Sequence, residues 1–145
     1  MDGWGADMTA NASSSVGGLG ADPTNYYPAA GTPIQSSSGN QANVAAVVTM
    51  PAVAGKTNYL AGILITSAGA TAAAVVSVTI TGTLGGTITQ TYVCNAGATV
   101  GNAPLQMNFN PPIPATGPNV AITVTLPALG AGNTNATVTA FGFQV

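Results

Sequence analysis

The sequence predicts an all-β protein, namely an antiparallel β-sandwich of about seven or eight strands, arranged like a jelly roll and preceded by an extended N-terminal arm. Two observations lead to this prediction. Short stretches from residue 43 onward alternate apolar side chains with polar or small ones, which is the period of a strand that buries one face. Runs of Pro, Gly, Asn and Ser separate these stretches at the spacing of a sandwich or barrel, and no stretch has a helical period.

The arm is expected at residues 1–42. This segment is rich in Gly, Ser, Pro and Ala, so it cannot bury enough apolar surface to offset its own ordering entropy. It nevertheless contains five large side chains that would suit an interface, Trp4, Met8, Leu19, Tyr26 and Tyr27. Two interpretations stay open: a disordered tail with incidental aromatics, or an arm that anchors these side chains on a neighbouring subunit. Packing of the two tyrosines on their own domain would fit equally well.

The sandwich domain is expected at residues 43–145, and its first predicted hairpin covers residues 43–66. A strand at 43–50 leads into a loop at 51–58 that contains Pro and Gly, and the return strand covers 59–66. The return strand is apolar on both faces, which is typical of a strand in the middle of a sheet or of a strand with one face covered by something else.

The next two strands are predicted at residues 74–81 and 87–94, on either side of a turn whose glycines permit positive φ. Val76, Val78 and Ile80 alternate with Ser and Thr in the first strand, and Thr residues line one face of the second. Together these strands predict a sheet surface that is polar but uncharged.

A further strand is predicted at residues 105–110, and the prolines that follow it are expected to end it and to form an extended corner at residues 111–118. An eighth strand would come from residues 33–38. The chain then closes with strands at 120–126 and 136–145, predicted to pair antiparallel, with Phe141, Phe143 and Val145 on one face of the second.

Two of these regions have similar sequences, and this similarity is here called the internal echo. Residues 47–58 (VVTMPAVAGKTN) resemble residues 123–135 (TVTLPALGAGNTN), because both run from a strand through Pro-Ala and a loop of small residues to Thr-Asn. The echo favours a duplicated hairpin related by pseudo-symmetry. Convergent turn chemistry in a chain this rich in Ala, Gly and Thr is the alternative.

Charge is almost absent from the chain. Charged residues make up 3% of it, and they are Asp2, Asp7, Asp22 and Lys56; the chain has no His, Glu or Arg. General acid–base catalysis and metal binding need such side chains, so we expect no enzymatic activity, no cofactor and no metal. Nucleic-acid binding needs several Lys or Arg to neutralise phosphates, so we expect no nucleic-acid partner.

Cysteine content and hydropathy give two further expectations. Cys94 is the only cysteine, which rules out a disulfide within the chain, and its place in a predicted strand indicates a half-buried structural thiol. The N-terminus has no basic and apolar signal segment, and the longest apolar run, residues 59–65, is too short to span a membrane. We therefore expect no membrane partner.

A free β-sandwich usually protects its edge strands with charge, above all with lysine. This chain has almost none, which favours a subunit of an assembly. Residues 51–87 (PAVAGKTNYLAGILITSAGATAAAVVSVTITGTLGGT) and residues 118–145 (PNVAITVTLPALGAGNTNATVTAFGFQV) resemble small virion proteins of tailed bacteriophages, and in particular the capsid cement or decoration proteins. The resemblance lies in the overall pattern of residues 43–145, and the arm has no counterpart in it.

The resemblance implies a non-enzymatic structural protein that is made in the host cytoplasm and ends up on the outer surface of the capsid. It would be a jelly-roll homo-oligomer, a dimer or a trimer, that binds the major capsid protein and stabilises the shell. No catalytic residues come with this family. The alternative is a β-sandwich module of a phage tail or fibre that binds a receptor or a glycan.

Overall fold

The computed structural model describes residues 31–145, and these residues form eight β-strands and no helix. The strands are β1 (Thr32–Ser37), β2 (Ala46–Met50), β3 (Asn58–Ser67), β4 (Ala74–Thr81), β5 (Ile88–Cys94), β6 (Leu105–Pro114), β7 (Ile122–Leu126) and β8 (Ala136–Gln144). The predicted all-β fold is confirmed, and so is the candidate eighth strand near residues 33–38.

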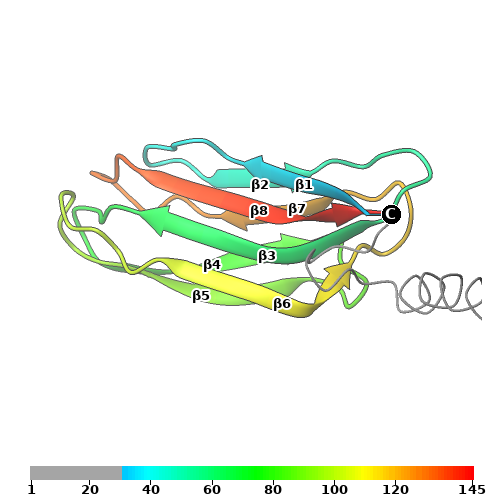
Figure 1. The fold of residues 1–145 in the computed structure, drawn as a ribbon. Helices are drawn as coiled ribbons and strands as arrows, with labels where there is room; N and C mark the ends of the chain where they lie inside the picture. Colours follow the sequence, from blue (N-terminus) through cyan, green and yellow to red (C-terminus); the bar gives the residue numbers. More distant parts are fainter. Residues whose placement is uncertain (1–30) are drawn as a thin grey trace, which may run out of the picture. The chain divides into compact units, whose positions relative to one another are not determined.

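Two four-stranded antiparallel sheets lie face to face, with strand orders β1-β8-β3-β6 and β2-β7-β4-β5 (Figure 1). The paired neighbours are β1 with β8, β2 with β7, β3 with β6, and β4 with β5. Along the sequence, each of these pairs lies between the two strands of the pair before it. This is a long antiparallel ribbon folded over into two layers, which is the topology of a jelly roll. Of the two alternatives for the doubly apolar strand, the central position is confirmed, since β3 pairs with β8 on one side and β6 on the other.

The core lies between the two sheets and follows the predicted alternation. In β4, Val78 and Ile80 are fully buried whereas Ser77 and Thr81 are exposed. Each fully buried Val, Ile or Leu contributes about 1.5–3 kcal/mol relative to an exposed one. The largest fully buried apolar side chains are Met50, Leu60, Ile63, Ile65, Val78, Ile80, Ile122, Val124, Leu126, Leu129 and Val138.

The two hairpins predicted at residues 43–66 and 119–145 are wrong. β2 and β3 belong to different sheets, and so do β7 and β8; only β4 and β5 pair directly across their turn. Pro, Gly and Asn mark where a strand ends, but they do not decide whether the chain returns beside that strand or crosses about 10 Å to the facing sheet. The loops at residues 51–57 and 127–135 are long enough to cross.

The internal echo has a structural counterpart, although the predicted duplicated hairpin does not exist. Residues 47–58 carry the chain from β2 to β3, and residues 123–135 carry it from β7 towards β8. Since β2 pairs with β7 and β3 pairs with β8, the two echo segments make equivalent crossovers between the same two sheets.

The prolines after Asn110 do not end the strand as predicted. β6 continues through Pro111 and Pro112 to Pro114, past a cis peptide bond between Asn110 and Pro111. Proline is tolerated here because β6 is an edge strand, so part of its backbone has no ladder partner to lose. The register with β3 shifts between Leu60 and Gly62, which accommodates the irregular stretch.

The first strand of the sandwich lies within residues 1–42. Part of the segment assigned to the arm, residues 32–37, is β1, and it lies at the edge of a sheet beside β8. The backbone continues this contact past β1, where Ser38 N donates to Val138 O and Gln41 exchanges two hydrogen bonds with Ala136. Ile34 packs against the core from this strand.

Candidate interaction surfaces

The described surface carries almost no charge. Lys56, in the loop between β2 and β3, is the only charged side chain among residues 31–145. This part of the chain contains no cluster of His, Cys, Asp or Glu that could hold a metal ion. Cys94 is completely buried in the core, deeper than the half-buried position predicted for it, and its Sγ lies 3.7 Å from the carbonyl oxygen of Asn95.

The outer face of the sheet β2-β7-β4-β5 presents an ordered array of small hydroxyl and valine side chains, here called the Thr–Val face. The pairing of the strands places these residues in rows that run across the sheet. One row crosses all four strands, and its members are Val47, Thr125, Thr79 and Thr89. The other members are Thr49, Thr123, Thr81, Ser77, Thr91, Val75 and Val93. The uncharged surface predicted for the β4–β5 pair therefore extends over the whole sheet.

Within the Thr–Val face, hydroxyl groups bond to one another and to the backbone. The Oγ1 atoms of Thr49 and Thr123 lie 3.2 Å apart, and Thr81 Oγ1 lies 3.4 Å from Thr123 O. Val75 and Val93 stand directly opposite each other and are 70% and 55% exposed. This exposed apolar pair lies at the β5 edge of the sheet.

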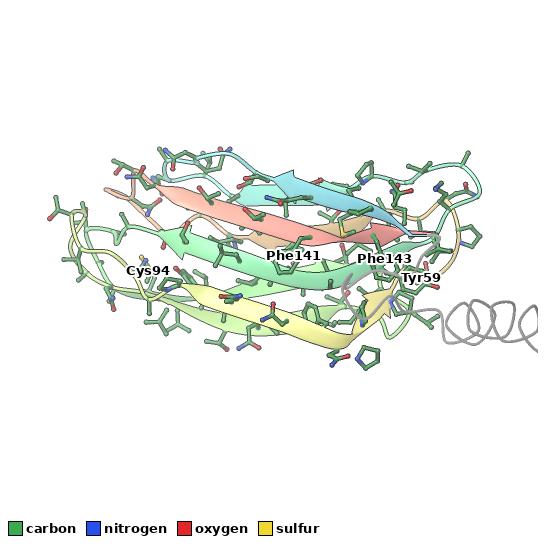
Figure 2. All side chains as sticks on the ribbon, viewed as in Figure 1. Tyr59, Cys94, Phe141 and Phe143 are labelled. Atoms are coloured by element: carbon green, nitrogen blue, oxygen red, sulfur yellow. The ribbon has the colours of Figure 1, made fainter. Side chains whose placement is uncertain are left out.

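The outer face of the other sheet carries an aromatic strip made of Tyr59, Phe141 and Phe143 (Figure 2). Tyr59 and Phe143 are directly opposite each other on β3 and β8, and their rings stack with centroids 4.9 Å apart and planes 8° from parallel. Phe141 lies over Gly62, where an added Cβ would come within 2.5 Å of the ring. The absence of a side chain at Gly62 thus makes room for the strip.

One end of the sandwich is held by a buried amide pair. Asn58 Nδ2 donates to the carbonyl oxygens of Pro51 at 3.0 Å and Val120 at 2.8 Å. Gln144 Nε2 donates to Asn58 Oδ1 at 2.8 Å and to Pro51 O at 3.1 Å. These bonds tie two loops and the end of β8 together, so this end is a fixed framework.

The opposite end contains a second set of buried amides. Asn102 Nδ2 donates to Ser67 Oγ at 2.6 Å and to Ala68 O at 3.0 Å, and Ser67 Oγ also lies 2.9 Å from the Tyr92 hydroxyl oxygen. Asn133 Nδ2 donates to Ala68 O at 2.7 Å. Both ends of the sandwich therefore use neutral amides where many proteins use ion pairs.

The interface residues predicted from the sequence, Trp4, Met8, Leu19, Tyr26 and Tyr27, lie outside the described residues. Sequence reasoning placed Phe141 and Phe143 on one face, which is confirmed, but it did not recognise that this face is the outer one. The available signal was that β8 is apolar on both sides: Val138 and Ala140 already supply the core, so the phenylalanines must point outward.

No helix long and apolar enough to cross a membrane occurs in the described part of the chain. Comparisons with protein-family models, with curated proteins and with solved structures find no match for this chain. The resemblance to capsid cement proteins therefore stays a prediction.

Proposed function

We propose that this chain is a non-enzymatic structural protein of a bacteriophage virion, a cement protein that binds the outer surface of the major capsid shell as a homo-oligomer. The observation that supports this proposal best is the near absence of charge over the whole described surface. A protein that stays free in solution usually keeps itself apart from other copies by surface charge. A subunit that is always covered by partners has no such need.

Binding of such a protein would stabilise the capsid shell through thermodynamic linkage between binding and assembly. A protein that binds only the assembled shell stabilises it against disassembly by the free energy of that binding. A rigid sandwich suits this role, because both of its ends are fixed by buried amides and its two outer faces are ordered. Contacts made by Thr, Asn and Val side chains also persist at high ionic strength.

The test is a binding and heat-challenge assay on capsids stripped of this protein. The full chain is expected to bind stoichiometrically and to raise the temperature at which the particles release DNA. A chain that lacks residues 1–30 tests the arm, and the cut must not extend to residue 42 because β1 would be lost. Weaker binding of this shortened chain would assign the arm to the capsid contact. Absence of binding by the full chain would refute the proposal.

The capsid-facing side can be identified with a matched pair of variants. Thr125→Lys places a charge on the Thr–Val face, and Thr139→Lys places one on the outer face of the other sheet. Both threonines are half-buried and lie on inner strands of their sheets. Loss of capsid binding in only one of the two variants identifies the face that meets the capsid.

The alternative is a tail or fibre module that binds a glycan, and the aromatic strip is the observation that would favour it. Sugars bind on the open faces of aromatic rings flanked by polar groups. Here one face of the Tyr59 ring and one face of the Phe143 ring are turned towards each other, and Phe143 is only 4% exposed. The strip is therefore a poor sugar platform. Binding on a glycan array that Tyr59→Ala abolishes would reverse this preference.

A further inference from the structure

The two sheets have four edge strands, and these edges are not equivalent. β1 and β6 border one sheet, and β2 and β5 border the other. An edge strand offers unpaired N–H and C=O groups to another chain unless Pro, charge or short length blocks it. Only one of the four edges has none of these blocking features.

Three of the edges are short or interrupted. β1 has six residues and contains Pro33. β2 has five residues, and Pro51 follows it directly. β6 contains three prolines in its second half and pairs irregularly with β3.

β5 is different in each of these respects. Its seven residues, ITQTYVC, include no Pro, no Gly and no charged side chain. All seven have a partner on β4, and among the described residues no backbone hydrogen bond joins β5 to any other segment. Its outward side chains, Thr89, Thr91 and Val93, are exposed. β5 is thus the longest continuous edge that the described part of the chain leaves open.

We propose that β5 pairs antiparallel with β5 of a second copy of this chain, so that two Thr–Val faces join into one continuous sheet. The inference rests on the self-association in the proposed function and does not depend on the capsid. A two-fold axis through Thr91 is the only register that pairs all seven residues, since Thr91 is the midpoint of Ile88–Cys94. Such an interface is self-complementary and closes after two copies.

The chemistry of this register is favourable for a second copy. Thr91 would face Thr91 of the second copy, and Thr89 would face Val93 of the second copy, all on the outer face. Thr–Thr and Thr–Val are well-suited cross-strand pairs, and no like charges meet. Backbone hydrogen bonds of the added strand supply most of the affinity in this mode of association.

The test uses the full chain in solution without capsids. Thr91→Lys places two like charges opposite each other at the two-fold axis, and we expect it to raise the dimer dissociation constant at least about tenfold. Thr49→Lys is the matched control, because Thr49 is exposed on the same face but lies on the β2 edge. Mass is measured by native mass spectrometry or light scattering, and circular dichroism checks that each variant is folded.

A crosslinking pair keeps the test decisive if Thr91→Lys fails to fold. In a Cys94→Ala background, Thr91→Cys should form a disulfide-linked dimer on oxidation, because directly opposed Cα atoms of an antiparallel pair are about 4.5–5.5 Å apart, a separation that a disulfide can span. Thr49→Cys in the same background should not. A chain that is monomeric at all concentrations overturns both self-association and this inference. An oligomer that Thr91→Lys leaves intact, or that crosslinks at residue 49 instead, overturns the β5 interface alone.

Discussion

Asn58 is the buried side chain with the most structural partners at its end of the sandwich. Its amide donates to Pro51 O and Val120 O, and its Oδ1 accepts from Gln144 Nε2. Asn58→Ala would remove the amide donor to Val120 O and one of the two acceptors of Gln144 Nε2, while Pro51 O would keep its bond from Gln144. A buried polar group that loses its partner costs about 1–3 kcal/mol. We expect this variant to lose about 2–4 kcal/mol of unfolding free energy in urea denaturation.

The control is Asn40→Ala, the same substitution at an exposed asparagine that donates a single bond to Thr134 O at 3.2 Å. An exposed group of this kind can bond to water when its partner is lost, so the change should stay within about 0.5 kcal/mol. Equal effects of the two substitutions would contradict the framework role of Asn58.

Gly62 is required by the aromatic strip. A Cβ at this position would lie 2.5 Å from the Phe141 ring and 2.6 Å from the carbonyl oxygen of Met107. We expect Gly62→Ala to lower the unfolding free energy by about 1–3 kcal/mol, because either the ring or the β6 backbone must move. Thermal or urea denaturation measures the loss.

Two companion variants separate steric crowding from a general effect of replacing glycine. Gly85→Ala adds the same atom where nothing lies within 4 Å, so it should be close to neutral. Adding Phe141→Leu to Gly62→Ala should recover part of the lost stability, because the smaller side chain can turn away from the new methyl group. If no recovery occurs, the Met107 carbonyl rather than the ring causes the crowding.

At the level of elements, the sequence predicted where strands lie but not how they pair. Alternation located β4, β5 and β7 within a residue or two, because one face of each is buried. Pairing depends on whether each loop returns in the same sheet or crosses to the other. This choice is set by packing of the whole sandwich, so the predicted partners of β2 and β8 were wrong.

The candidate surfaces could also be predicted only within neighbouring strands, and not across strands that are far apart in sequence. The threonines of β4 and β5 predicted a polar, uncharged face from the two strands alone. The extension of that face onto β2 and β7 required the register of two strands far apart in sequence. The open edge at β5 could not be predicted either, because the sequence does not say which strands end a sheet.

β1 belongs to the folded body, and this gives a prediction for truncated chains. A chain of residues 43–145 would lose the burial of Ile34 and the hydrogen bonds that Ser38 and Gln41 make with β8. It would also expose β8 as a new sheet edge. We expect its Tm to lie at least about 5 °C below that of a chain of residues 31–145. Equal values of Tm would show that β1 adds nothing to stability.

At the scale of the whole molecule, neutral groups hold both ends of the sandwich and cover the outer face of one sheet. The ends of the sandwich are fixed by Asn and Gln amides, and the outer face of one sheet is covered by Thr and Val. Burial of a neutral amide is less costly than burial of a charge, and it needs no counter-ion. The stability of such a fold depends on packing and on neutral hydrogen bonds.

This has a measurable consequence for pH and salt. Stability changes with pH only where the folded and unfolded chains bind different numbers of protons. The chain has no His or Glu, and its three Asp all precede residue 23, so few groups titrate between about pH 5 and pH 7. We expect the free energy of unfolding in urea to vary by less than about 0.5 kcal/mol over this pH range. We expect a change no larger than this when NaCl is raised from about 0.05 to about 0.5 M. Sodium sulfate should raise it, because excluded salts strengthen apolar burial. If the free energy of unfolding fell steeply as NaCl is added, the few charges of the chain, Lys56 included, would stabilise the fold far more than their number suggests.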